Sequence, residues 1–307
     1  MKIVTILLWM SFMIKNVRAL SSIIPPTTDA LTAAQKIWKD KYLYETDIHE
    51  IIRCGNDIPR FHLAYMPMRN RAEILRLILE ESGCSYDLEL IGYRNWENSV
   101  KATTPQGKCP LLRNYDGKGN DLGQEGAITR FLAKQLGLAG RNPSEEAELD
   151  SLYCVWFSTM RNNGISHDGE HYSVASLRKS PPTIKRLRYE EVFRRDSLSK
   201  VERSLMALGY FEERLEKTGS GFLVSTGPTY VDLGLFYILF ELAEDDNVPD
   251  FAEKFGFPKL GVFLESMQSR PRIKDYITSP RRMPRYERNA EGTSLYTYVE
   301  GRGSSRR

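Results

Sequence analysis

Residues 61–79, FHLAYMPMRNRAEILRLIL, decide the fold because they place a strand directly before a helix. Phe61, Leu63 and Tyr65 alternate with other residues, which is typical of a short strand, and MPMRN then breaks the pattern. The helix that follows has Gly83 placed to end it and an apolar stripe made of Ile74, Leu75, Leu77 and Ile78. We therefore predict a β-α unit.

The chain up to residue 140 extends this unit into an α/β domain. YDLELI, residues 86–91, predicts a second strand, and GKCPLLRNYDGKGNDLG, residues 107–123, predicts two strands around a Gly-rich turn. Residues 124–140 predict a helix because apolar residues recur at three-and-four spacing: Ile128, Phe131, Leu132 and Leu136. Residues 60–140 therefore predict a β-α-β-β-β-α domain.

A second domain follows, and its pattern is helical throughout. Asn142 can cap a helix and Glu145 completes a capping box with it. From there to about residue 280 the long segments have helical periodicity, so residues 141–280 predict an all-α domain. Thr229 and Asp232 form another capping box, a folding feature with no catalytic implication.

The N-terminus has the pattern of a secretory signal peptide, residues 1–19. Lys2 precedes an apolar run of about 12 residues, too short to span a bilayer, and the segment ends in Ala19. The alternative is a buried or interfacial helix. Residues 20–59 then predict an N-terminal extension, with a helical stretch over 28–52. Because the segment behind the signal is rich in Ser and Thr, two predictions stay open: the secretory pathway, or an organelle reached through a signal plus a transit segment.

Composition excludes several classes of protein. The net charge is +3 and charges of both signs are interspersed, so we predict no nucleic-acid partner. We also predict that no membrane span remains after removal of the signal peptide. His167 and His171 lie four apart, but the Gly between them argues against a metal site. Residues 281–307 form a basic tail that we expect to be disordered. The cysteines lack metal-ligand or scaffold spacing and predict free thiols: Cys54, Cys84, Cys109 and Cys154.

The order of motifs FHLAYMPMRNRAEILRLIL, GKCPLL, QEGAITRFLAKQLGLAG, TYVDLGLF and SRPRIKDYITS resembles a cytosolic-type glutathione transferase over residues 60–280. The class that looks most similar is sigma, which includes glutathione-dependent prostaglandin D synthases. The resemblance implies a thioredoxin-like N-terminal domain, an all-α C-terminal domain and a homodimer. It also implies a detoxification enzyme that conjugates glutathione, its co-substrate, to small hydrophobic electrophiles, or isomerises or reduces peroxidic substrates with the same thiolate.

The resemblance implies that Tyr65 and Arg71 are catalytic. Tyr65 ends the first strand of the motif, where a side chain can face a cleft. The thiol of glutathione has a pKa of about 8.5 and is mostly protonated at neutral pH, so a donor aimed at the sulfur favours the thiolate. Arg71 matches an arginine that supports this thiolate electrostatically. Taken without the resemblance, Tyr65 also suits a half-buried strand tyrosine, and Arg71 also suits a solvated arginine.

Further positions match residues that hold the glutathione peptide. Trp96 and Lys101 match a pair at the glycine end, although one extra residue separates them here, and a core or loop Trp is the alternative. Lys108 precedes Cys109 and Pro110, where the family has a cis-proline whose preceding backbone groups bind the cysteinyl part.

Glu125 departs from the family, which mostly reads Gln-Ser where this chain reads Gln124-Glu125. A carboxylate there repels the γ-glutamyl carboxylate of glutathione. However, sigma-like dimers supply an aspartate from the neighbouring subunit to the γ-glutamyl ammonium, and that aspartate is also missing here. In LDSLYCVWFSTM, residues 149–160, where it is expected, only Asp150 is acidic. Glu125 either binds this ammonium within its own subunit, with Gln124 and the helix amides on the carboxylate, or is a helix charge in a site that no longer holds glutathione.

Two questions stay open at this stage. The electrophile pocket is expected between the domains, lined partly by Tyr153, Trp156, Phe157 and Met160, which are at helical spacing and equally suit a core. The rival function is a non-catalytic binding or structural protein that kept the transferase fold.

Overall fold

The computed structural model describes residues 48–157, 200–224, 227–243, 249–279 and 281–283. Several predictions lie outside these residues: the signal peptide at 1–19, His167 and His171, Met160 and most of the basic tail. In the described residues, no helix is long and apolar enough to cross a membrane, and no group of His, Cys, Asp and Glu is arranged to hold a metal ion.

A five-stranded mixed sheet forms the N-terminal domain, in the order β1-β3-β2-β4-β5. The strands are β1 (His49–Cys54), β2 (Phe61–Tyr65), β3 (Tyr86–Ile91), β4 (Leu111–Leu112) and β5 (Leu122–Gly123). β2 and β3 are parallel and the remaining pairs are antiparallel. The four strands predicted from Phe61 onward are therefore present.

β1 corrects one prediction, because we expected residues 28–52 to be helical. Residues 49–52 instead belong to a strand that pairs antiparallel with β3, with Ile52 opposite Leu88 and Cys54 opposite Tyr86. The β-branched Ile51 and Ile52 favour this extended form, and Cys54 is buried on the core face. The sheet thus begins within the segment expected to be an extension.

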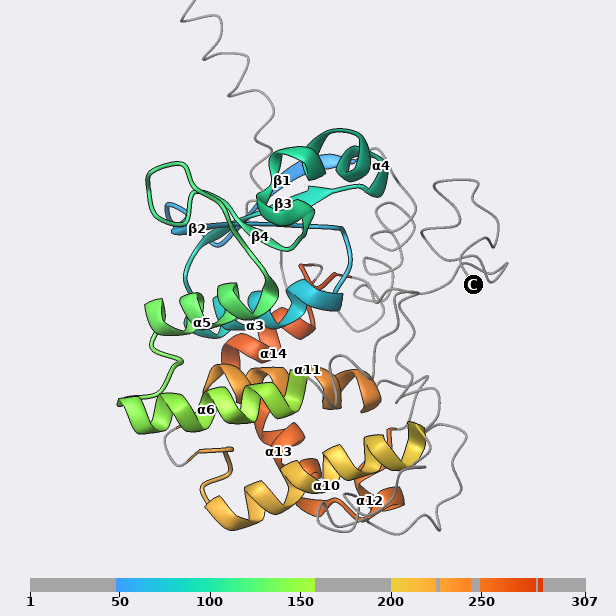
Figure 1. Ribbon diagram of the computed structural model, residues 1–307. Coiled ribbons are helices and arrows are strands. Elements are labelled where there is room, and N and C mark those ends of the chain that lie inside the picture. The colour runs from blue at the N-terminus through green and yellow to red at the C-terminus, as the bar shows by residue number, and fades with distance from the viewer. Residues whose placement is uncertain (1–47, 158–199, 225–226, 244–248, 280, 284–307) are drawn as a thin grey trace, which may run out of the picture.

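Helices cover both faces of the sheet (Figure 1). On one side lie α3 (Glu73–Ser82), which ends at Gly83 in the left-handed conformation, and α5 (Glu125–Gln135). The connection from β3 to β4 covers the other side with short helices: α4 (Tyr93–Asn95), η3 (Trp96–Val100), η4 (Lys101–Thr103) and η5 (Pro105–Gly107). A turn of 3-10 helix, η2 (Asn70–Ala72), leads into α3.

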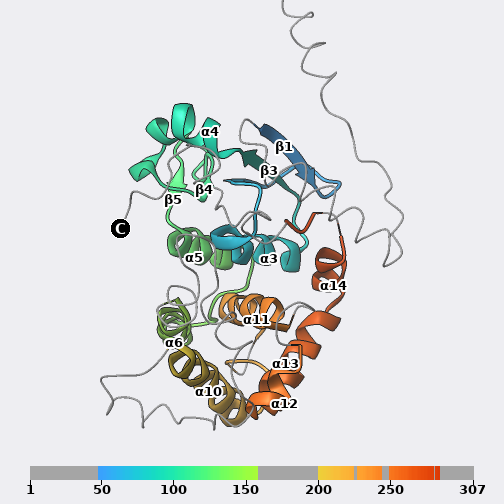
Figure 2. The same ribbon diagram turned by 90° about the vertical axis from the view of Figure 1, so that its right-hand side faces the viewer.

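The second domain is helical in all of its described residues. Its helices are α6 (Pro143–Val155), α10 (Lys200–Thr218), α11 (Tyr230–Ala243), α12 (Phe251–Phe255), α13 (Pro258–Ser269) and α14 (Pro271–Ile277). Figure 2 shows α11 at its centre, between α3 and α5 on one side and α10 and α13 on the other. Nearly every residue of α11 is buried, so this helix connects the cores of the two domains.

Each predicted capping box has side-chain bonds that hold its helix start. In the first, the Glu145 N–H donates to the Asn142 side chain at 3.0 Å, while the Glu145 carboxylate accepts from the N–H of Arg141, one residue before the cap. Asp232 accepts from the Thr229 N–H and hydroxyl at 2.8 and 2.7 Å and from the Leu223 N–H at 2.8 Å. Asp232, Thr229 and Leu223 are all buried. The Asp232 carboxylate thus links the loop before α11 to the first turn of this helix.

Candidate functional site

Tyr65 and Arg71 stand at the two ends of the loop that joins β2 to α3. Tyr65 is buried at the end of β2. The loop turns tightly, with the Met68 N–H donating to the Met66 carbonyl at 2.7 Å, and Asn70 has φ 38°. Arg71 follows in η2 with its side chain 42% exposed. The loop therefore places a phenol and a guanidinium near the entrance to α3.

Glu125 faces this arginine. Arg71 Nη1 lies 3.8 Å from Glu125 Oε2, and the Glu125 side chain is only 2% exposed. Glu125 is the first residue of α5, where the helix amides favour a negative charge. The carboxylate is thus balanced by an arginine as well as by the helix end.

The Cys109–Pro110 peptide bond is cis, as the resemblance implies, and it precedes β4. Burial raises the pKa of the Cys109 thiol to about 12, although the nearby charges of Arg71 and Lys108 act in the opposite direction. This thiol therefore stays protonated at neutral pH.

A π turn joins Trp96 to Lys101, the pair that the resemblance implies is separated by one extra residue. Residues Trp96–Val100 form the π-helical segment η3, and the Lys101 N–H donates to the Trp96 carbonyl, five residues back. A π turn holds one residue more than an α turn, and such turns are frequent at functional sites. Trp96 is buried in the small apolar cluster that also contains Tyr65, and the exposed Lys101 ammonium donates to Glu97 at 3.0 Å.

A hydrogen bond that the sequence did not predict links two glutamines across the site. Gln124 Nε2 donates to Gln106 Oε1 at 2.7 Å. Gln124 has φ 72° and Gln106 has φ 60°, a region that side-chain-bearing residues seldom adopt and that clusters at functional sites. Their 18-residue separation leaves no pattern that could reveal the pair. Lys108 is exposed nearby in the chain, before Cys109.

Among the described residues expected to line an electrophile pocket, Trp156 and Tyr153 are buried in the core and Phe157 is half-buried. Trp156 is fully buried, and a Cβ at Gly234 would approach both its ring and Ile74 at 3.1 Å, so Trp156 belongs to the core between the domains. Tyr153 is also buried and stacks on the half-buried Phe157.

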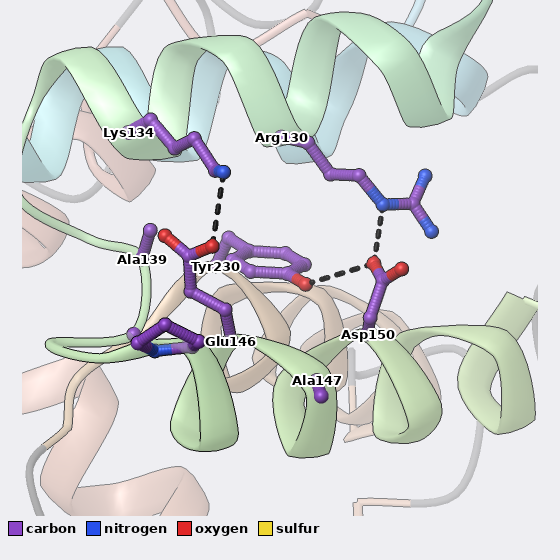
Figure 3. Close-up of a pocket in the computed structure, with 9 residues that line it drawn as sticks. Arg130, Lys134, Ala139, Glu146, Ala147, Asp150 and Tyr230 are labelled. Atoms are coloured by element: carbon purple, nitrogen blue, oxygen red, sulfur yellow. Dashed lines mark hydrogen bonds and ion pairs between the residues drawn. The ribbon is translucent and has the colours of Figure 1, made fainter.

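A separate cavity of about 320 Å³ lies between α5 and α6 (Figure 3). Lys134 pairs with Glu146 at 3.0 Å, Arg130 pairs with Asp150, and the Tyr230 hydroxyl donates to Asp150 at 3.5 Å. The four charges neutralise one another, and none of the predicted glutathione-site residues lines the cavity. Asp150 therefore has partners within the same chain.

Comparison with known proteins assigns the chain to a family. Residues 167–280 match the family model described as glutathione S-transferase, C-terminal domain. Probable glutathione S-transferase 6 of Caenorhabditis elegans is 32% identical over 219 residues, which cover 71% of this chain and 96% of that protein. The chain belongs to the glutathione S-transferase family. The predicted fold, a thioredoxin-like domain followed by an all-α domain, is confirmed.

Two solved structures are informative about finer properties of this glutathione S-transferase. Monomeric Na-GST-3, from the hookworm Necator americanus, is 27% identical, covers 71% of this chain and 95% of its own, and has a TM-score of 0.51. The sigma class enzyme of Fasciola hepatica is 26% identical, covers 72% and 98%, and has a TM-score of 0.52. The first is described as monomeric and the second as sigma class, and they match this chain about equally well, so the homodimer and the sigma class both stay predictions.

Proposed function

We propose that this glutathione transferase acts in detoxification, conjugating glutathione to small hydrophobic electrophiles. The observation that carries this proposal is the site around the β2–α3 loop in a chain of this family. There Tyr65, Arg71, the cis Cys109–Pro110 bond and the start of α5 occur together.

Tyr65 and Arg71 are the proposed catalytic residues. The Tyr65 hydroxyl donates a hydrogen bond to the glutathione sulfur, and the half-exposed Arg71 adds a positive charge. Both favour the thiolate over the thiol, and each pKa unit gained corresponds to about 1.4 kcal/mol. The thiolate then attacks the electrophilic carbon: a C–S bond forms, the leaving group departs with its bonding electrons, and the thiol proton passes to solvent. The same thiolate also suits isomerisation or peroxide reduction.

Glutathione would lie beside the residues that precede β4 and reach the start of α5. The backbone of Cys109 before Pro110 binds the cysteinyl part, as an added strand would. Lys101 and Lys108, both exposed cations, attract the glycine carboxylate. Trp96, in the apolar cluster, would contact the glycine end of glutathione. The π turn joins Trp96 to Lys101 despite the extra residue, which supports a common role for the two.

Glu125 binds the γ-glutamyl ammonium in this proposal, with Gln124 and the α5 amides on the carboxylate. Two observations support it. The Glu125 carboxylate is balanced by Arg71, which reduces its repulsion of the γ-glutamyl carboxylate. Asp150, the remaining acid of the stretch that sigma-like dimers use for this ammonium, is paired with Arg130 in its own subunit.

We also propose a sigma-like homodimer that enters the secretory pathway, or an organelle through a transit segment. The support is the family resemblance and the signal-like residues 1–19. Light scattering would test the dimer, and a mass of one chain at micromolar concentration would contradict it. N-terminal sequencing should find the mature protein starting at or after Leu20; recovery of residues 1–19 on the purified protein would contradict the signal peptide.

The rival function is a non-catalytic binding or structural protein, which the departure at Glu125 favours. Calorimetry of the mature protein with glutathione distinguishes the two. Binding together with turnover of a chlorinated aromatic electrophile supports the transferase, whereas no binding at millimolar glutathione favours the rival.

A further inference from the structure

The loop that carries Tyr65 and Arg71 contains a buried arginine whose side chain pairs with a residue outside the loop. Arg69 lies between the two catalytic positions, and its side chain is only 8% exposed. The loop has a tight turn at Met66–Met68, and Asn70 has a positive φ. A short segment in such conformations needs interactions with neighbouring elements to persist.

Glu241, on the central helix α11 of the second domain, supplies one of these interactions. Arg69 Nη1 lies 3.5 Å from Glu241 Oε1, and the Glu241 side chain is 1% exposed. The pair therefore spans the boundary between the domains, where α11 packs under α3 (Figure 2). Because both charges are out of water, removing one takes a balancing charge away from the other, which is unfavourable.

A second buried cluster holds the start of α3 next to this pair. Arg76 donates to Glu73 Oε2 at 3.0 Å and to the Arg69 carbonyl at 3.5 Å. The Tyr276 hydroxyl donates to Glu73 at 3.1 Å from α14. The backbone and the side chain of Arg69 are thus held separately, the first by Arg76 and the second by Glu241. Loss of the Glu241 charge would therefore weaken the side-chain contact of Arg69 and leave the contact of Arg76 with Glu73 in place.

We infer that Glu241 is a positioning residue for the catalytic loop: through Arg69 it fixes the placement of Tyr65 and Arg71 from the other domain. The catalytic consequence rests on the proposed function, whereas the effect on the loop does not. Misplacement of reacting groups by about 1 Å can reduce a rate by about 100-fold. Glu241 therefore matters for turnover although it lies beneath the loop rather than in the substrate cleft.

The test compares Glu241→Gln with Glu212→Gln in the full chain. Glu212 is the matched control because it is also a buried glutamate of the helical domain, but it accepts from the Lys259 and Leu260 N–H groups at the start of α13. Hydrogen exchange of the peptide covering residues 66–72 reports on the loop. The kcat and the KM for glutathione report on the site, and thermal melting reports on general stability.

Both variants should lower the Tm, but we expect Glu241→Gln alone to accelerate exchange in residues 66–72 and to lower kcat about 10- to 100-fold, with KM changed much less. The double variant Arg69→Met/Glu241→Gln, which removes both charges, should recover stability without recovering kcat. Equal exchange in the loop for Glu241→Gln and Glu212→Gln would overturn the inference. Faster loop exchange in a protein that shows no turnover even as wild type would support the loop assignment and reject the proposed function instead.

Discussion

Arg71 and Glu125 face each other across the site, with Nη1 and Oε2 3.8 Å apart, although they are 54 positions apart in the chain. The separation is that of an ion pair and exceeds that of a direct hydrogen bond. Glutathione carries both an ammonium and a carboxylate on its γ-glutamyl part. The pair thus places a buried acid, balanced by an arginine, where the γ-glutamyl part is proposed to bind.

Glu125→Gln should weaken glutathione binding about tenfold or more, because a well-aligned charge-assisted hydrogen bond contributes about 1.5 to 3 kcal/mol. Calorimetry measures the change. A purely repulsive Glu125 predicts tighter binding, so the sign of the change separates the two readings. A glutathione analogue without the α-amino group is the control: weakening of equal size with this analogue would show that Glu125 acts on the helix end instead.

Tyr65→Phe should retain glutathione binding and lower the conjugation rate about 10²- to 10³-fold, because it removes one donor to the thiolate. Steady-state kinetics with a chlorinated aromatic electrophile measure the rate. The variant keeps the ring, which belongs to the same buried apolar cluster as Trp96. An unchanged rate would remove Tyr65 from the mechanism.

Asp232→Ala should lower the free energy of unfolding by about 2 kcal/mol or more, because the buried Thr229 and Leu223 N–H groups lose their acceptor. Asp250→Ala is the control, since Asp250 is also an aspartate at the start of a helix, as the N-cap of α12, but makes no side-chain capping bond. Denaturant titration should find the control within about 0.5 kcal/mol of wild type. Equal destabilisation by both variants would contradict the capping role.

Glu89 should make stability depend on pH in the acid range. Burial acts to raise the pKa of this carboxyl, but His62, Arg113 and His49 around it lower the pKa well below its usual 4.5. A carboxyl with a lowered folded-state pKa contributes stability above its unfolded pKa and loses that contribution as the pH falls. The stability gap between wild type and Glu89→Gln should therefore shrink below about pH 4.5, measured by denaturant titration. A gap that stays constant down to about pH 3 would contradict this.

The sequence was sufficient where the signal is local. The apolar stripes of α3 and α5 and the capping boxes at Asn142 and Asp232 depend on residues three or four apart, and the structure has each of them. The cis bond before Pro110 came from the family resemblance and is also present.

Features that depend on distant partners could not be predicted. Strand β1 forms because β3 lies beside it, with Ile52 opposite Leu88, and nothing near Ile52 in the chain reveals that partner. The Arg71–Glu125 and Gln106–Gln124 contacts likewise join separate elements. The extra residue before Lys101 can be noticed in the sequence, but the π turn between Trp96 and Lys101 is found only in the backbone structure.

The most direct test of the central claim is calorimetric titration of the mature protein with glutathione, with wild type and Glu125→Gln compared in the same buffer. The account predicts saturable binding of one glutathione per chain to wild type and binding at least about tenfold weaker to the variant. Absence of binding to wild type at millimolar glutathione would contradict it.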